Sequence, residues 1–199
     1  MRKVFFPLFT VLVVASAAFA QSKDAYQYTV DLTNVVDDKV YVELTPPPIS
    51  STEITFYLPK IIPGTYAIED YGRFVSKFEA LNKKGKPLPV EKKDVNSWVI
   101  KNANQVTKIR YWIEDSFDTK IEGEEIFWPA GTNIEEGKNF LINAAGFFGY
   151  FDGMKRSPFV FNVIKPEGFY GATGLIAEQT NAPVSTLKLE KNPQTTPGK

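Results

Sequence analysis

The sequence predicts an all-β protein, folded as an antiparallel β-sandwich of about 8–10 short strands with at most a short helical turn near residues 67–72. Hydrophobic and polar residues alternate through most of the chain, which is the pattern of half-buried strands. Turn signals separate these segments at intervals of roughly 8–12 residues. Helical spacing occurs only at Ile68, Tyr71 and Val75, where Gly72 weakens it. This combination is typical of a sandwich or barrel rather than of alternating strands and helices.

The first two strands are expected to form a hairpin. Residues 26–33 alternate hydrophobic and polar side chains, and residues 40–45 do so again after the turn signal Asp37-Asp38. Residues 46–48 are three prolines, which offer no N–H donors to a sheet, so pairing should end there. Further strands are expected at residues 54–58, 73–82, 87–92, 97–102, 106–115 and 158–165. Residues 116–150 are less regular.

The segment from Leu58 to Val75 interrupts the strands with a tight turn at Pro63-Gly64, since proline fixes φ and glycine frees it. Glu69, Asp70 and Arg73 follow within ten residues. They could contact a charged peptide end, or they could brace the turn against the next strand. We favour the brace, because backbone groups in an irregular turn need partners.

Residues 147–151, Phe-Phe-Gly-Tyr-Phe, gather four aromatic side chains around one glycine. If exposed, they would form an interaction surface. If buried, they would close one end of the sandwich, and burial is the favoured interpretation because aromatic side chains dominate cores of this size.

The composition excludes several kinds of chemistry. The chain of 199 residues has no histidine and no cysteine, so imidazole bases, thiol chemistry and the common zinc sites are absent. Its 23 basic and 23 acidic residues leave no large field of one sign, which argues against nucleic acid as a partner. Carboxylates at Glu122, Glu124, Glu125, Glu135 and Glu136 could in principle cleave a glycosidic bond, but a solvated acidic loop is favoured. We therefore expect no catalytic, cofactor-binding or metal-binding residue in this chain.

The N-terminus has the features of a secretory signal over residues 1–20. Arg2 and Lys3 precede an apolar stretch, and Ala18-Phe19-Ala20 forms a cleavage site before Gln21. The mature chain should be exported, to the periplasm or beyond, with no membrane contact after cleavage. One sandwich domain is expected over residues 21–180, followed over residues 181–199 by a polar segment that is either a disordered tail or a truncated linker.

A series of motifs resembles the glycyl aminopeptidase family of zinc peptidases, specifically its non-catalytic N-terminal domain. The matching stretches cover about residues 25 to 175, and they are Leu58-Pro59, Pro63-Gly64-Thr65-Tyr66, Asp70-Tyr71-Gly72-Arg73, Phe78-Glu79-Ala80, Gly85, Leu88, Trp98, residues 129–133, residues 147–151 and residues 165–170. Two departures stand out. Ile61 replaces a tryptophan of many relatives, and the catalytic domain does not follow Gly174-Leu175.

The resemblance implies a β-rich domain that packs on a thermolysin-like catalytic domain and helps shape a peptide cleft. In the family, zinc is held by a His-Glu-x-x-His motif of that other domain, and a PDZ domain often follows. This chain would then be no enzyme alone, but a truncated or split module. Its partners would be a catalytic domain, in the same polypeptide or a separate one, and peptide substrate. Candidates for cleft or domain contacts are Tyr66, Asp70, Arg73, Phe147, Phe148 and Tyr150. The alternative is a stand-alone exported module that binds peptides or glycans.

Overall fold

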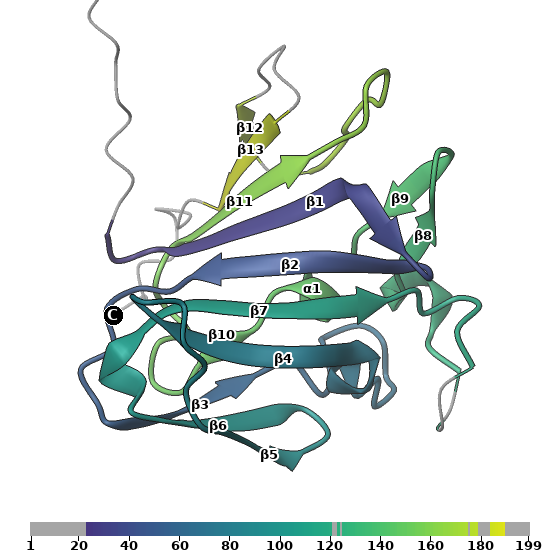
Figure 1. The fold of residues 1–199 in the computed structure, drawn as a ribbon. Helices are drawn as coiled ribbons and strands as arrows, with labels where there is room; N and C mark the ends of the chain where they lie inside the picture. Colours follow the sequence, from purple (N-terminus) through teal and green to yellow (C-terminus); the bar gives the residue numbers. More distant parts are fainter. Residues whose placement is uncertain (1–22, 121–122, 124, 175, 179–183, 190–199) are drawn as a thin grey trace, which may run out of the picture.

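The computed structural model describes residues 23–120, 123, 125–174, 176–178 and 184–189, which form two packed sheets and a small third one (Figure 1). The larger sheet runs in the order β12 (Ile176–Glu178), β13 (Val184–Leu189), β11 (Phe159–Ile164), β1 (Tyr26–Val36), β2 (Lys39–Thr45), β7 (Val106–Glu114) and β4 (Val75–Asn82). The smaller sheet runs in the order β10 (Tyr150–Phe151), β3 (Glu53–Tyr57), β6 (Ser97–Lys101) and β5 (Val90–Asp94). The third sheet pairs β8 (Asn133–Glu135) with β9 (Asn139–Leu141).

Most strand pairs are antiparallel, so the predicted all-β class is confirmed. The hairpin of β1 and β2 forms as expected, and its turn places Asp37 and Asp38 at φ 51° and 55°. One pair departs from the antiparallel expectation, because β1 lies parallel to β11. β5 begins at Val90 rather than at residue 87, since Pro87 and Pro89 cannot donate to a ladder.

The described residues contain four short helical segments, more than the single turn predicted near residues 67–72. They are η1 (Tyr71–Phe74), η2 (Ala103–Gln105), η3 (Trp128–Ala130) and α1 (Ala144–Phe147). No helix in this part of the chain is both long and apolar enough to span a membrane.

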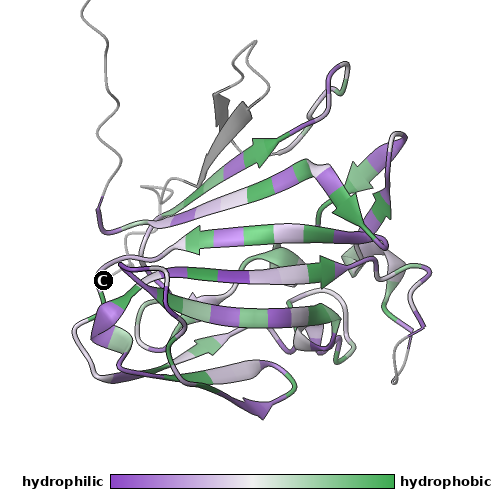
Figure 2. Ribbon diagram, in the orientation of Figure 1, coloured by the Kyte–Doolittle hydropathy of each residue, from purple (hydrophilic) through white to green (hydrophobic). Residues whose placement is uncertain are grey.

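The core lies between the two main sheets and is built from alternating positions of their strands (Figure 2). Aromatic rings join the layers. The ring centres of Phe56 in β3 and Tyr111 in β7 lie 6.1 Å apart. Phe78 of β4 stacks on Trp98 of β6, with ring centres 4.8 Å apart. Burial of such rings is the main favourable contribution to the free energy of folding, because the chain has no cysteine and so cannot form disulfides.

Residues 147–151 are anchored in this core, and the interpretation that they are buried holds for Phe147 and Phe151, whereas Phe148 and Tyr150 are half-buried. Phe147 and Phe151 are fully buried. Tyr28 and Tyr111, both from the larger sheet, donate hydrogen bonds to the carbonyl oxygens of Gly149 and Phe147 at 2.7 and 2.5 Å. The larger sheet therefore supplies the partners that this irregular backbone needs.

The prediction of a disordered tail is wrong for residues 184–189. These residues form β13 and pair antiparallel with β11 from end to end. The backbone groups at the edge of β11 supply the pairing, so a segment whose hydrophobic residues do not alternate regularly can still join the sheet. Residues 181–183 and 190–199 lie outside the described residues. The predicted signal peptide, Glu122 and Glu124 lie outside them as well.

Candidate functional site

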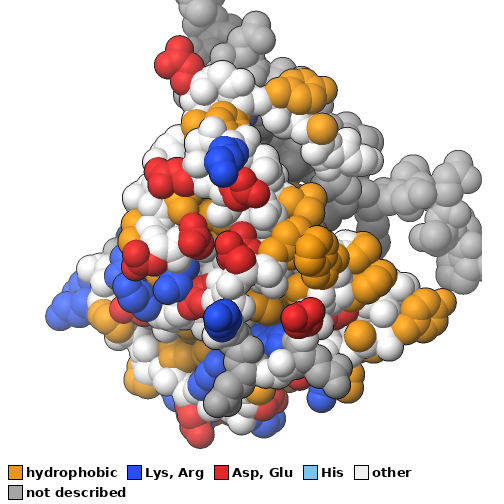
Figure 3. Space-filling model, turned by 90° about the vertical axis from the view of Figure 1, so that its right-hand side faces the viewer, with side chains coloured by type: hydrophobic (Ala, Val, Ile, Leu, Met, Phe, Trp, Pro, Cys, Tyr) orange, Lys and Arg blue, Asp and Glu red, His pale blue; other side chains and the backbone are white. Residues whose placement is uncertain are grey.

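Two segments distant in sequence meet at the end of the sandwich that faces the viewer in Figure 3. One contains residues 58–75 and the other residues 115–135. The backbone N–H of Phe127 donates to the carboxylate of Glu69 at 3.3 Å, and the hydroxyl of Tyr71 donates to the carbonyl of Ala130 at 2.9 Å. The two segments therefore form one continuous surface.

The Pro63-Gly64 turn forms as predicted. Gly64 has φ 97°, a conformation that favours glycine, and the N–H of Thr65 lies 3.5 Å from the carbonyl oxygen of Ile62. The hydroxyl of Thr65 donates to the same oxygen at 3.1 Å. At the base of the loop, the N–H groups of residues 69 and 70 both donate to the carbonyl of Lys60 at 3.0 Å. The loop thus provides hydrogen-bond partners for several of its own backbone N–H groups.

Asp70 and Gly72 are tied to the turn between β5 and β6 through Asn96. The amide nitrogen of Asn96 donates to Asp70 at 2.7 Å, and the N–H of Gly72 donates to the Asn96 side-chain oxygen at 2.9 Å. A Cβ on Gly72 would lie 2.1 Å from the carbonyl oxygen of Val95, so glycine is required for this close approach. These contacts favour the brace over the peptide-end site for Asp70.

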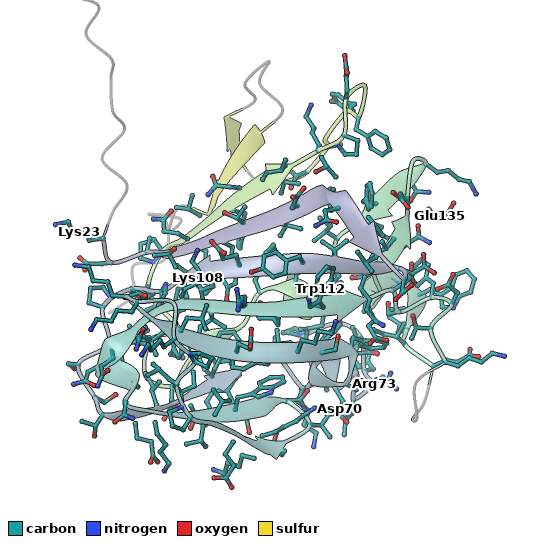
Figure 4. The ribbon with its side chains drawn as sticks, viewed as in Figure 1. Lys23, Asp70, Arg73, Lys108, Trp112 and Glu135 are labelled. Carbon is teal, nitrogen blue, oxygen red and sulfur yellow. The ribbon has the colours of Figure 1, made fainter. Side chains whose placement is uncertain are left out.

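Arg73 completes the brace without an ion pair to its predicted neighbours. Its Nε donates to the backbone carbonyl of Glu69 at 3.1 Å, and its guanidinium lies 4.8 Å from the centre of the Phe74 ring. Figure 4 shows Asp70 and Arg73 close together at this end. The carboxylate of Glu69 is only 1 % exposed, and its Oε1 has no hydrogen-bond partner within the described part of the chain. A buried polar atom without a partner costs stability.

Beside Arg73 lies an open cavity of about 390 Å³. Phe117 and Trp128 form part of its wall and stack on each other at 5.3 Å. Asp118 and Lys120 also line it, so the cavity is mixed in charge. Burial, and then the neighbouring carboxylates of Asp115 and Asp38, raise the pKa of Asp118 above its usual value. The cavity has the size and mixed character to accept a side chain of a partner.

The same end carries a concentration of exposed hydrophobic side chains, which we call the end patch. It consists of Ile61, Tyr66, Ile68, Phe127 and Trp128, each between 46 % and 98 % exposed. Figure 3 shows hydrophobic side chains gathered on part of this face. Exposed apolar groups that cluster in this way mark interaction surfaces.

Of the six candidate residues named from the sequence, Tyr66, Asp70 and Arg73 come together at this end. Phe147 is fully buried in the core, and Phe148 packs on Phe161 at 4.2 Å. Tyr150 is half-buried against Tyr57. Sequence reasoning missed Asn96, Phe127 and Trp128. Adjacent bulky aromatic residues just before Pro129, in an otherwise irregular stretch, were the available signal for the last two.

The described residues include no group of three or more His, Cys, Asp or Glu side chains placed to hold a metal ion. Glu135 forms an ion pair with Lys138 at 3.4 Å rather than facing another carboxylate. Glu125 and Glu136 are exposed, as a solvated acidic loop requires.

The chain was compared with known proteins in three ways. Residues 27–192 match the family described as the Peptidase M61 N-terminal domain. The crystal structure of an aminopeptidase N family protein from Idiomarina loihiensis is similar, with a TM-score of 0.60 and 17 % identity, over 82 % of this chain and 29 % of that chain. The similarity shows a shared fold, and this chain spans less than a third of that neighbour's length. A search among curated proteins found no match.

Proposed function

This chain belongs to the Peptidase M61 N-terminal domain family, and we propose that it is an exported, non-catalytic module that packs on a peptidase catalytic domain and helps to shape its peptide cleft. The family match carries the proposal, because it extends over residues 27–192 and so over nearly every strand of both main sheets. The chain has no histidine and no cysteine, so the usual protein ligands for a catalytic zinc would have to come from the partner.

The proposal is tested by mixing residues 21–199 with the catalytic domain of an M61 peptidase that has been produced without its own N-terminal domain. A complex should form in size-exclusion chromatography, and peptide hydrolysis by the catalytic domain should increase. An unrelated immunoglobulin-type sandwich is the control. Separate elution with unchanged hydrolysis would contradict the proposed function.

Export is tested separately by the mass of the protein recovered after expression in a bacterium. We propose cleavage after Ala20, so the mature chain should begin at Gln21. Replacement of Ala18 and Ala20 by leucine should leave the precursor uncut, because the cleavage site requires small residues. Full-length protein that stays inside the cell would contradict export.

A second role, the binding of a glycan, is favoured by one observation on the outer face of the larger sheet. Tyr41 of β2 and Trp112 of β7 lie opposite each other, with ring centres 5.5 Å apart, and Lys108 pairs with Glu43 on the same face (Figure 4). Aromatic rings beside charged groups can stack on sugar rings and bond to their hydroxyls. Quenching of tryptophan fluorescence by cell-wall oligosaccharides, absent in Trp112→Phe, would support this role, because the chain has two other tryptophans.

A further inference from the structure

Tyr66 stands out from the rest of the end patch in both exposure and backbone conformation. Its side chain is 98 % exposed, more than any other large hydrophobic residue in the described chain. Its φ is 57°, in the left-handed region, which is strained for a bulky side chain. An almost fully exposed ring makes little contact within its own domain, so packing here does not explain why the strain is kept.

Hydrogen bonds on both sides of Tyr66 hold the loop in that conformation. Thr65 bonds to Ile62 through both its backbone and its hydroxyl, and the loop closes at its base on the carbonyl of Lys60. Asn96 then ties Asp70 to the smaller sheet. A side chain presented in advance on such a loop loses little conformational entropy when it meets a partner.

The surroundings of Tyr66 resemble an interface centred on one anchor. Ile61 and Ile68 belong to the same loop and are each more than half exposed. Phe127 and Trp128 extend the apolar surface from the adjoining segment, which Glu69 and Tyr71 hold in place. Tyrosine and tryptophan are enriched among the residues that dominate binding energy.

We propose that the end patch is the surface that docks on the catalytic domain, with Tyr66 as its anchor inserted into a pocket of that domain. This inference rests on the proposed function and names the surface that performs it. The family match supplies the occupant, because it describes this unit as the N-terminal domain of a peptidase.

The experiment measures affinity by isothermal titration calorimetry, with residues 21–199 titrated into the same isolated M61 catalytic domain. Tyr66→Ala should weaken binding about thirty-fold or more, the loss expected for an anchor residue. Tyr170→Ala is the matched control, because Tyr170 is 81 % exposed and lies outside the end patch. It should change the affinity less than about two-fold. Thermal unfolding of both variants checks that they remain folded.

The outcomes separate the two proposals. No binding by the wild-type chain would overturn the proposed function and the docking surface with it. Binding that is lost in neither variant, or in Tyr170→Ala alone, would overturn only the docking surface. A wild-type dimer in sedimentation velocity that Tyr66→Ala dissociates, without binding to the catalytic domain, would overturn the assigned occupant in favour of a second copy of this chain.

Discussion

Residues 147–151 and residues 60–70 are both irregular and rich in hydrophobic side chains, yet they occupy opposite environments. The first segment lies inside the sandwich, where hydroxyl groups of the larger sheet meet its carbonyl oxygens. The second closes on its own backbone and on Asn96, and it exposes Ile61, Tyr66 and Ile68. The contrast teaches that an irregular backbone can find its partners either in the sheets or within its own loop, and that only the first arrangement buries the aromatic side chains here.

The largest effect is expected from deletion of a ring in the buried segment. Phe147→Ala should lower the free energy of unfolding by about 3–5 kcal/mol, because Phe147 is fully buried and its removal leaves a cavity. Phe127→Ala, in the exposed surface, should lower it by less than about 1 kcal/mol. Urea unfolding followed by tryptophan fluorescence measures both. Equal losses would show that the two regions do not differ as described.

The second largest effect is expected from alkaline pH, which should destabilise the packing around the buried segment. Burial raises the pKa of Tyr26, whose hydroxyl accepts the N–H of Phe151, to about 12. The folded chain therefore holds this proton more tightly than the unfolded chain does. Stability should be full below about pH 10 and fall as the pH rises toward 12, by about 1.4 kcal/mol per pH unit for each such tyrosine.

The pH dependence is measured as the urea midpoint between pH 8 and 11, with tyrosinate absorbance recorded in parallel. Tyr26→Phe should give a shallower decline, whereas Tyr170→Phe, at an exposed site, should follow the wild type. The same slope in all three proteins would remove Tyr26 from the explanation.

The hydrogen bonds of Asn96 that brace the exposed segment should contribute less to the free energy of unfolding than the core does. Asn96→Ala removes the acceptor of the Gly72 N–H and the donor to Asp70, so stability should fall by about 1–3 kcal/mol. Asn104→Ala, at an exposed position, serves as the control and should stay within about 0.5 kcal/mol. Hydrogen exchange should also speed up in residues 60–75. Unchanged exchange there would argue against the brace.

The smallest effect concerns the strain at Tyr66. Tyr66→Gly relieves the left-handed backbone but adds freedom to the unfolded chain, so a gain in stability of at most about 1 kcal/mol is expected. Tyr170→Gly, where φ is not positive, should give no gain. Calorimetric melting temperatures compare the two. A clear loss in Tyr66→Gly would show that the ring stabilises its own domain.

The sequence was sufficient for the fold class and for most of the larger strands, because a period of two records which face of a strand is buried. It did not reveal that β1 pairs with β11, since alternation says nothing about which strand edges meet. It did not reveal β13, because two polar residues in succession, Ser185 and Thr186, break the alternation of hydrophobic residues in that strand. Asn96 was missed because its side chain accepts the N–H of Gly72, which lies 24 residues earlier in the chain. No local sequence pattern around Asn96 indicates such a distant partner.

The parallel pairing of β1 with β11 has a consequence for the order of folding. Tyr26 at the start of β1 bonds to Met154, 128 positions later, while its hairpin partner β2 follows almost at once. During synthesis the hairpin can form early, but one edge of β1 must wait unpaired until β11 emerges. Contacts this distant in sequence make folding slow.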